Sequence, residues 1–315
     1  MPCFSCKIRE QINKPCRLDR YVSENLNLLS RSQIKARRLQ AKVNGKDVKI
    51  SRILKQGDNL ELFWDDAPSA DIVPQDIPLE IIYEDDKQIV INKAQGMVVH
   101  PGAGNRQGTL ANALYFRILN KNQVSAGKTA QTCDANMRPG IVHRLDKDTS
   151  GVIIAAFDEE THEFLAQQFK SRKVQKYYIA IVKGEPKEIK GNIETFIARD
   201  PKDRKRFTVA ANGRNAITAY KVIKTWKSYS FLLLRPRTGR THQLRVHLRH
   251  IGCPILGDPV YGSEDKLFPG AALMLHSKKL VITLAGEKEE RIFTSPAPDR
   301  FTEVIEKLDR INANG

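Results

Sequence analysis

The sequence predicts an α+β protein made of a small and a large domain, on three observations. Asp65–Pro78 has three prolines and four acidic residues without a periodic apolar pattern, as expected of a linker. The segments after this linker are mostly short apolar runs typical of strands. They show no repeated strand–helix–strand order, which favours a large, mostly antiparallel mixed sheet flanked by helices over a doubly wound parallel sheet.

The small domain is expected to cover residues 17–64, with residues 1–16 as an N-terminal extension. Amphipathic periodicity predicts two short helices, at Arg17–Leu28 and Ser30–Gln40. Two strands follow around Asn44-Gly45, a dipeptide typical of a type I′ hairpin, and this domain ends in a strand.

Basic residues of the second predicted helix are expected to lie on one face. Ser30 is the expected N-cap of this helix. Spacings of i, i+4, i+7 and i+11 place four side chains together: Arg31, Lys35, Arg38 and Lys42. Such a face beside a tight hairpin is typical of a small RNA-binding module, although a solvated helix face has the same pattern.

The large domain is expected to cover residues 79–310. Its strands are predicted at Leu79–Tyr83, Gln88–Asn92, Gly151–Phe157, Lys176–Val182, Asn192–Ala198, Ala216–Thr225 and Tyr229–Arg235. One helix is predicted after Asp158, which can cap it, and Glu159 and Glu160 complement its dipole. A second helix is predicted at about Thr241–His250.

The charge of the chain indicates a polyanionic partner. In its 315 residues, 52 Lys and Arg against 36 Asp and Glu give a net charge of +16 and a pI near 9.6. Arg31–Lys55 has a net charge of +8 and Arg199–Arg249 one of +12, so the rest of the chain carries −4. A basic surface that serves only solubility has no reason to be segregated in this way.

The composition excludes several classes of protein. With 41% hydrophobic and 28% charged residues, the chain is not disordered as a whole. No window approaches the roughly 18 apolar residues of a membrane span. The N-terminus lacks the apolar stretch of a secretory signal, so we expect a cytoplasmic protein. Five scattered cysteines do not suggest a disulfide framework.

The residues indicate neither a metal site nor a nucleotide cofactor. Three N-terminal cysteines lack a nearby fourth ligand. His242, His247 and His250 are spread around their predicted helix rather than gathered on one face. Gly102-Ala103-Gly104 is not followed by a correctly spaced third glycine in a strand–helix context, so it is not a dinucleotide-binding motif.

One segment carries the pattern of a functional site. Pro139–Ala156 (PGIVHRLDKDTSGVIIAA) places a charged cluster with His143, Arg144 and Asp146 between two apolar runs. The cluster ends in Thr149-Ser150-Gly151, directly before a predicted buried strand. Polar residues at a sharp turn between strands usually face a cleft.

This segment resembles the HRLDxxTSG signature of the pseudouridine synthases of the ribosomal large subunit, the RluA-like family. Three more segments are similar to family motifs, in the family's order: Lys176–Ala180, Thr238–Gly262 and Leu275-His276. Arg17–Trp64 resembles the S4 RNA-binding domain that precedes the catalytic domain in many members. Val98–Leu114 is most like the D-type group, which acts on a stem-loop of large-subunit rRNA that faces the small subunit.

The resemblance implies a uridine isomerase acting on RNA without a cofactor. Asp146 matches the catalytic aspartate, which attacks the base or ribose or removes a ribose proton. Arg245 matches the arginine that pairs with it, and a carboxylate in a pocket needs such a cation to stay ionised. Tyr178 matches the tyrosine that would stack on uracil or move a proton. Residue type alone leaves open a core tyrosine and a surface arginine.

Further residues are expected to hold the RNA. A stacked uridine must be extruded at a cost of about a few kcal/mol, and Arg144 matches the family position that fills the vacated stack. His143 either binds phosphate or supports the turn. Arg240 and His242 lie in the third motif and are expected to contact RNA. Arg199–Arg206 is expected to bind phosphates, unless it is a solvated loop.

The expected partner is rRNA, within a precursor of the large subunit (pre-50S), bound by a monomer of this chain. One alternative is the same reaction on another rRNA loop or on tRNA. Another is a ribosome-assembly factor that binds RNA without catalysis. The intact set of Asp146, Tyr178 and Arg245 favours an enzyme over this second alternative.

Overall fold

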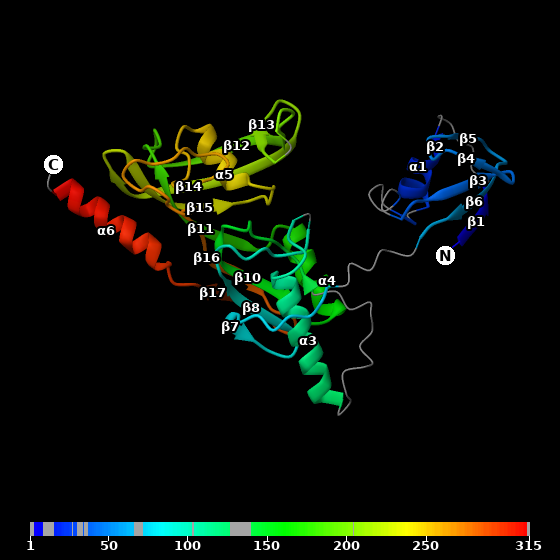
Figure 1. The fold of residues 1–315 in the computed structure, drawn as a ribbon, viewed down its shortest axis with the longest axis horizontal. Coiled ribbons are helices and arrows are strands. Elements are labelled where there is room, and N and C mark those ends of the chain that lie inside the picture. The colour runs from blue at the N-terminus through cyan, green and yellow to red at the C-terminus, as the bar shows by residue number, and fades with distance from the viewer. Residues whose placement is uncertain are drawn as a thin grey trace. The chain divides into compact units, whose positions relative to one another are not determined.

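The computed structural model describes residues 3–8, 16–26, 28–29, 34, 37–65, 72–102, 104–126, 140–203 and 205–313. The chain divides into two compact units, Met1–Ile72 and Val73–Gly315 (Figure 1). The division falls within the predicted linker. In the described ranges, no helix is both long enough and apolar enough to cross a membrane.

The small unit contains a four-stranded sheet of order β1-β6-β3-β4 and a short β2–β5 pair. Its elements are β1 (Cys3–Lys7), β2 (Cys16–Arg17), α1 (Leu18–Arg20), the π-helical η1 (Tyr21–Asn25), β3 (Gln40–Val43), β4 (Lys46–Val48), β5 (Ile53–Leu54) and β6 (Asn59–Phe63). The predicted hairpin is confirmed, since Asn44 and Gly45 join β3 to β4 with φ angles of 53° and 77°. A type I′ turn requires positive φ at both positions.

Part of the predicted N-terminal extension belongs to the sheet of the small unit. β1 pairs antiparallel with β6, from Cys3 opposite Phe63 to Lys7 opposite Asn59. Ile8, which follows β1, is buried in the core of this unit. The strand is short and only its alternate residues are partly buried, so its periodicity is too weak to identify it from the sequence.

The prediction of four basic residues on one helix face is wrong for its C-terminal part. Arg31 and Lys35 lie outside the described residues. Arg38 lies in a turn with a φ of 47°, and Lys42 belongs to β3, opposite Glu61 of β6. Helical spacing ends where the backbone leaves helical geometry, so Lys42 does not continue the pattern of the predicted helix.

One large sheet forms the frame of the second unit. Its strands follow the order β13-β12-β14-β15-β11-β16-β10-β8-β7, with β17 beside β16 and β9 beside β10. Their bounds are β7 (Glu80–Glu84), β8 (Gln88–Lys93), β9 (Gly140–Ile141), β10 (Ser150–Ala156), β11 (Gln175–Lys183), β12 (Lys190–Arg199), β13 (Phe207–Val209), β14 (Arg214–Trp226), β15 (Tyr229–Pro236), β16 (Leu275–Thr283) and β17 (Glu290–Thr294). Among the described pairs, β10 and β16 are parallel and the others antiparallel, which confirms the predicted mixed sheet.

Four described helices accompany this sheet: α3 (Leu110–Ala126), α4 (Glu159–Lys170), α5 (Gln243–His250) and α6 (Asp299–Ala313). α5 packs near β12, β13 and β14, whereas α4 packs near β9 and β10 (Figure 1). Asp158 caps α4 as predicted, because its side chain accepts the N–H of Thr161 at 2.8 Å. The predictions of α4 and α5 are confirmed, while α3 and α6 were not predicted.

β10 fixes the position of the charged cluster that precedes it. All seven residues of this strand are buried. Gly151 has a φ of 111°, and a Cβ there would lie 2.2 Å from the carbonyl oxygen of Ser277 in β16. Because only glycine allows this approach, Thr149-Ser150-Gly151 anchors the cluster where β10 meets β16.

Candidate active site

A cavity of about 510 Å³ lies where three distant segments of the large unit meet. Most of its lining comes from residues within Val142–Thr149 before β10, Phe169–Tyr178 at the end of α4 and in β11, and Pro236–Arg245 before and within α5. Leu275, the first residue of β16, also lines it. Binding sites for small organic groups have volumes of roughly 300–1,000 Å³. The cavity brings together seven residues predicted from the sequence: Asp146, Tyr178, Arg245, Arg144, His143, Arg240 and His242.

Asp146 occupies a turn directly before β10. Its backbone carbonyl accepts the N–H of Thr149 at 3.1 Å, and the buried side chain of Leu145 anchors the turn in the core. The Asp146 side chain is 19% exposed, and its Oδ2 lies 3.4 Å from Nη1 of Arg245. A carboxylate has about four acceptor positions, so Asp146 retains acceptor capacity toward the cavity.

A buried lysine, which sequence reasoning missed, supports this turn. Lys93 at the end of β8 is fully buried. Burial lowers its pKa to about 8, although two nearby aspartates oppose the shift. Its Nζ donates hydrogen bonds of 2.7, 2.9 and 3.1 Å to the backbone carbonyls of Ala94, Met97 and Lys147.

Arg245 is held by a second aspartate that was also not predicted. Nε and Nη2 of Arg245 donate to the two carboxylate oxygens of Asp258, at 2.8 and 2.6 Å. Asp258 also accepts the backbone N–H groups of Val260 and Tyr261, both at 2.9 Å. Nη1 of Arg245 is left to face Asp146. The predicted Arg245–Asp146 contact is therefore present, but the close ion pair is with Asp258.

Both members of this buried pair are charged. Burial by itself would raise the pKa of Asp258, but the hydrogen bond and charge of Arg245 and two backbone N–H groups lower it overall. Burial likewise opposes the charge of Arg245, and the bond to Asp258 outweighs it, so the pKa of Arg245 is raised. In the sequence, Asp258 stands directly before a proline inside the third motif, and this was the one feature that could have drawn attention to it.

Tyr178 of β11 lines the same cavity and is buried, with 8% of its surface exposed. Burial raises its pKa to about 12; the charge of Asp146 adds to this shift and a contact with Ser277 opposes it. The hydroxyl is therefore protonated at neutral pH. This state favours a stacking ring or a proton donor over a base.

His242 directly precedes α5 and faces the same aspartate. Its backbone has a φ of 54°, which is uncommon for a residue other than glycine. Nδ1 lies 2.9 Å from the hydroxyl of Tyr261, and Nε2 lies 3.9 Å from Oδ2 of Asp146. Burial lowers the pKa of His242, against the attraction of Asp146. The ring is therefore neutral at neutral pH.

His143 is bound within the fold. Its Nε2 accepts the backbone N–H of Ile154 at 3.1 Å, and its ring stacks on Phe169 with centroids 4.5 Å apart. Burial, with a smaller effect of the Lys176 charge, lowers its pKa to about 3. A neutral ring with this nitrogen engaged is poorly suited to bind phosphate. Of the two roles that the sequence left open, the structure favours support of the turn.

The cavity lining is basic around a single acid. Asp146 is the one acidic residue among its described lining residues. The lining lysines and arginines are Arg144, Lys170, Arg172, Lys176, Arg237, Arg240 and Arg245. Arg144 is exposed, whereas Nε of Arg240 donates to the Asn215 carbonyl at 2.9 Å. Such a surface suits a polyanion that must be brought to one carboxylate.

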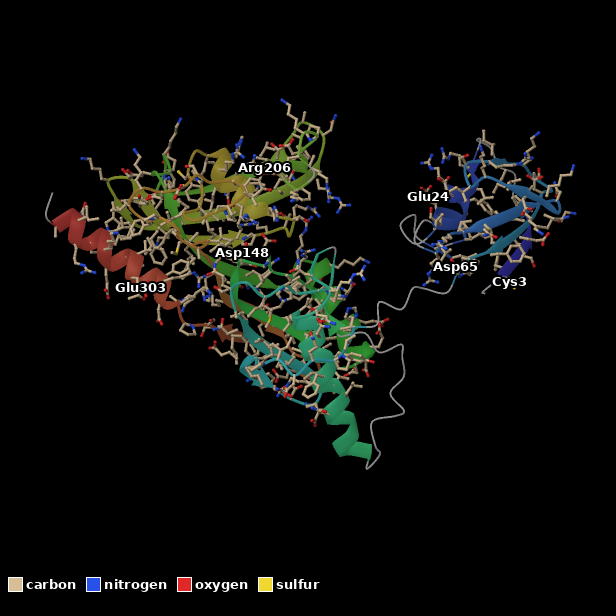
Figure 2. All side chains as sticks on the ribbon, viewed as in Figure 1. Cys3, Glu24, Asp65, Asp148, Arg206 and Glu303 are labelled. Carbon is tan, nitrogen blue, oxygen red and sulfur yellow. The ribbon has the colours of Figure 1, made fainter. Side chains whose placement is uncertain are left out.

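The basic run Arg199–Arg206 is only partly available for the phosphate binding predicted for it. Arg206 lies beside β13 (Figure 2), donates to the carbonyl of Val260, and has its guanidinium 5.8 Å from the Tyr261 ring. The guanidinium of Arg199 lies 5.4 Å from the ring of Phe207. Arg206 therefore contributes to the packing behind the cavity.

The remaining predicted residues do not line this cavity. Arg38 and Lys42 belong to the small unit, and Arg31 and Lys35 lie outside the described residues. Within the ranges that the structure describes, no group of three or more potential metal ligands occurs. The ring nitrogens of His247, one of the three helical histidines, lie 3.0 Å from the hydroxyls of Thr218 and Thr195.

The chain was compared with known proteins. A sequence profile described as RNA pseudouridylate synthase matches residues 87–250. The ribosomal large subunit pseudouridine synthase D of Borreliella burgdorferi is 44% identical over 310 residues, which cover 94% of this chain and 91% of that protein. The protein of the same name from Zymomonas mobilis is 40% identical over 256 residues, covering 79% and 78%.

A solved structure agrees with these matches. Human RNA pseudouridylate synthase domain containing 4 superimposes with a TM-score of 0.56 at 26% identity, and the match covers 73% of this chain and 93% of that one. This fold likeness accords with the mixed sheet of the large unit. The chain belongs to the RNA pseudouridylate synthase family.

Proposed function

We propose that this RNA pseudouridine synthase modifies uridines in large-subunit rRNA and that Asp146 is its catalytic carboxylate. The observation that carries the proposal is the single acid in a basic cavity, beside a guanidinium whose position is fixed by Asp258. The basic lining attracts RNA, while Arg245 favours the ionised form of the carboxylate that faces it.

The reaction requires few groups. The bond between N1 of uracil and C1′ of ribose breaks, the base turns, and a bond between C5 and C1′ forms, while C5 loses its proton and N1 takes one up. Asp146 acts as nucleophile or base in the first stage. Tyr178, protonated and beside Asp146, stacks on the base or donates a proton. No step needs a redox group or a second substrate.

The lining also suggests how the uridine enters. A cavity of about 510 Å³ receives a uridine only after it leaves its stack. Arg144 is exposed and lies two residues before Asp146, so its guanidinium can occupy the space that the base vacates. Arg240, Lys170 and Arg172 line the cavity and can contact phosphates.

Large-subunit rRNA is preferred as the substrate because two relatives are named for the ribosomal large subunit. Within that rRNA we propose a stem-loop facing the small subunit, modified in a pre-50S particle by a monomer in the cytoplasm. The small unit is proposed to act as an S4-type domain that binds the RNA backbone. Lys42 and Arg38 are its proposed contacts among the described residues.

The test measures tritium release from RNA labelled at C5 of uridine, because this hydrogen is lost only when C5 bonds to ribose. Purified protein is incubated with large-subunit rRNA, small-subunit rRNA and total tRNA, followed by mapping of the modified positions. Release from large-subunit rRNA alone is the expected result. Release from tRNA alone would transfer the proposal to tRNA, and tight RNA binding without release from any RNA would favour a binding-only factor.

A further inference from the structure

His242 is held in an unfavourable backbone conformation beside the proposed catalytic carboxylate. Positive φ is uncommon for residues other than glycine, although histidine adopts it more often than most, and it costs about 1–3 kcal/mol. His242, at 54°, is one of four described non-glycine residues with positive φ, and one of the two, with Arg172, that line the cavity. Strained residues that persist at a site are held there by surrounding contacts.

Those contacts determine which ring nitrogen of His242 carries the proton. The Tyr261 hydroxyl accepts the backbone N–H of Phe207 at 2.8 Å and lies 2.9 Å from Nδ1 of His242. Tyr261 is buried, with 4% of its surface exposed. Its hydroxyl proton needs an acceptor, and among the described residues Nδ1 is the one that lies within reach. Tyr261 therefore donates to Nδ1, which places the proton of the neutral ring on Nε2.

The Nε2–H group then faces Asp146, and it donates a hydrogen bond to no acceptor among the described residues. Nε2 lies 3.9 Å from Oδ2 of Asp146, which is too long for a hydrogen bond. The Nε2–H group therefore makes no hydrogen bond to Asp146, and it can donate to an acceptor that binds in the cavity beside this carboxylate. We propose that His242, held by Tyr261 as the Nε2–H tautomer, donates a hydrogen bond to an oxygen of the uridine that reacts with Asp146.

This inference rests on the proposed function, and it adds a catalytic donor to it. The charged groups around the ring are Asp146 and Asp258, which favour its protonation, and Arg245 and Arg144, which oppose it. A neutral donor at this position stabilises an oxygen that gains negative charge without transferring a proton to it. The donor is in place before the substrate arrives, so it costs no rearrangement during the reaction.

A matched pair of variants tests the donor. His242→Gln keeps an N–H near the position of Nε2, and His242→Met has the same chain length without a donor; both meet the same backbone strain. Single-turnover rates with labelled RNA should fall about 10²-fold in His242→Met, by analogy with loss of one preorganised donor, and by less than about tenfold in His242→Gln. RNA affinity should change less than about threefold in both. Equal rates in the two variants would overturn the proposal.

The acceptor is identified with altered substrates. RNA with 2′-deoxyuridine at the target position lacks one ribose oxygen, and 4-thiouridine replaces one base oxygen by a weaker acceptor. If His242 binds one of these oxygens, His242→Met should lose little further rate on the corresponding RNA. An undiminished effect of His242→Met on both of these RNAs and on 2-thiouridine RNA would contradict a hydrogen bond to the uridine.

The tautomer is tested without activity by long-range ¹H–¹⁵N correlation spectra of the full chain. His242, assigned by comparison with His242→Gln, should show the Nε2–H pattern, and Tyr261→Phe should show a mixture of tautomers. Tyr229→Phe is the matched control, because it removes a buried hydroxyl bonded to Asp265 at 2.8 Å outside the cavity. An Nδ1–H tautomer would overturn the inference even if the protein is an active synthase. The Nε2–H pattern in a protein inactive on every RNA would instead indicate failure of the proposed function.

Discussion

Asp146 and Asp258 face the same guanidinium from two turns of the large unit, but their hydrogen bonding differs. The Asp258 side chain has no exposed surface, and it accepts two hydrogen bonds from Arg245 and two from backbone N–H groups. The Asp146 side chain is 19% exposed and has one contact of 3.4 Å with Arg245. The acceptor positions of Asp258 are thus filled by hydrogen bonds from the protein, whereas Asp146 retains acceptor positions for the proposed reaction.

The two turns are also supported in different ways. An ion pair fixes the turn of Asp258, so its position depends on charge. The turn of Asp146 is supported by the neutral ring of His143 and by three backbone carbonyls bonded to Lys93. Substitutions of these aspartates, of Arg245 and of Lys93 can therefore distinguish residues that take part in the proposed reaction from residues that hold the turns in place.

Asp146→Ala should have the largest effect on catalysis. We expect a fall in the single-turnover rate of about 10⁴-fold or more, because the proposed reacting group is removed. RNA affinity and thermal stability should stay close to those of the parent, since Asp146 makes few contacts with the protein. Glu163→Gln is the matched control, because this carboxylate is exposed on α4 and does not line the cavity; its rate should stay within about threefold. Turnover retained by Asp146→Ala would refute the assignment.

Asp258→Asn should have the largest effect on stability. It leaves Arg245 buried without its partner, and breaking such a pair costs about 3–5 kcal/mol of unfolding free energy, to be measured by urea denaturation. A double variant with Arg245→Gln should lose less than the sum of the two single losses, because the pair is coupled. Strict additivity would mean that the ion pair does not hold this turn.

The residues that line the cavity could be predicted from the sequence, but the buried residues that fix their positions could not. Asp146, Tyr178 and Arg245 lie in local motifs, so their spacing was visible. The role of Lys93 depends on the carbonyl of Lys147, 54 residues away, and no local pattern reports such a contact. A lysine beside a strand is ordinarily exposed, which is why its burial could not be inferred.

The two missed helices differ in how well they could have been found. α6 could have been predicted, because Phe301, Val304 and Leu308 are buried at i, i+3 and i+7. The first five residues of α3, Leu110–Leu114, are all buried, including the polar Asn112. Such a run lacks the alternation of an amphipathic helix, so burial in the tertiary fold decided its structure.

Lys93→Met should weaken the support of Asp146. The variant leaves three backbone carbonyls without their donor inside the fold, at a cost of about 3 kcal/mol in unfolding free energy. Because these carbonyls belong to the loops around Asp146, the turnover rate should fall more than RNA affinity does. Urea denaturation and single-turnover kinetics measure the two effects. Unchanged kinetics in a destabilised protein would show that Lys93 supports the fold without positioning Asp146.

The smallest expected effect is a pH dependence that separates the two turns. The pKa of His143 is lowered to about 3 in the folded protein by burial, so between about pH 6.5 and 3 the unfolded chain binds the proton first. Stability present above about pH 6.5 is therefore lost as the pH falls, by about 1 kcal/mol for this ring over the first pH unit.

The buried rings of His247 and His276, with pKa values lowered to about 4 by burial, add to this loss. The Asp258 turn behaves differently, because its depressed pKa preserves the ion pair until the pH falls below the ordinary range of a carboxyl. Urea denaturation between pH 7 and 5.5 should thus show a shallower pH dependence in His143→Gln than in the parent, and an unchanged slope in Asp258→Asn. A slope that His143→Gln does not alter would mean that folding does not lower the pKa of this ring, and the turn of Asp146 would then not depend on its neutral form.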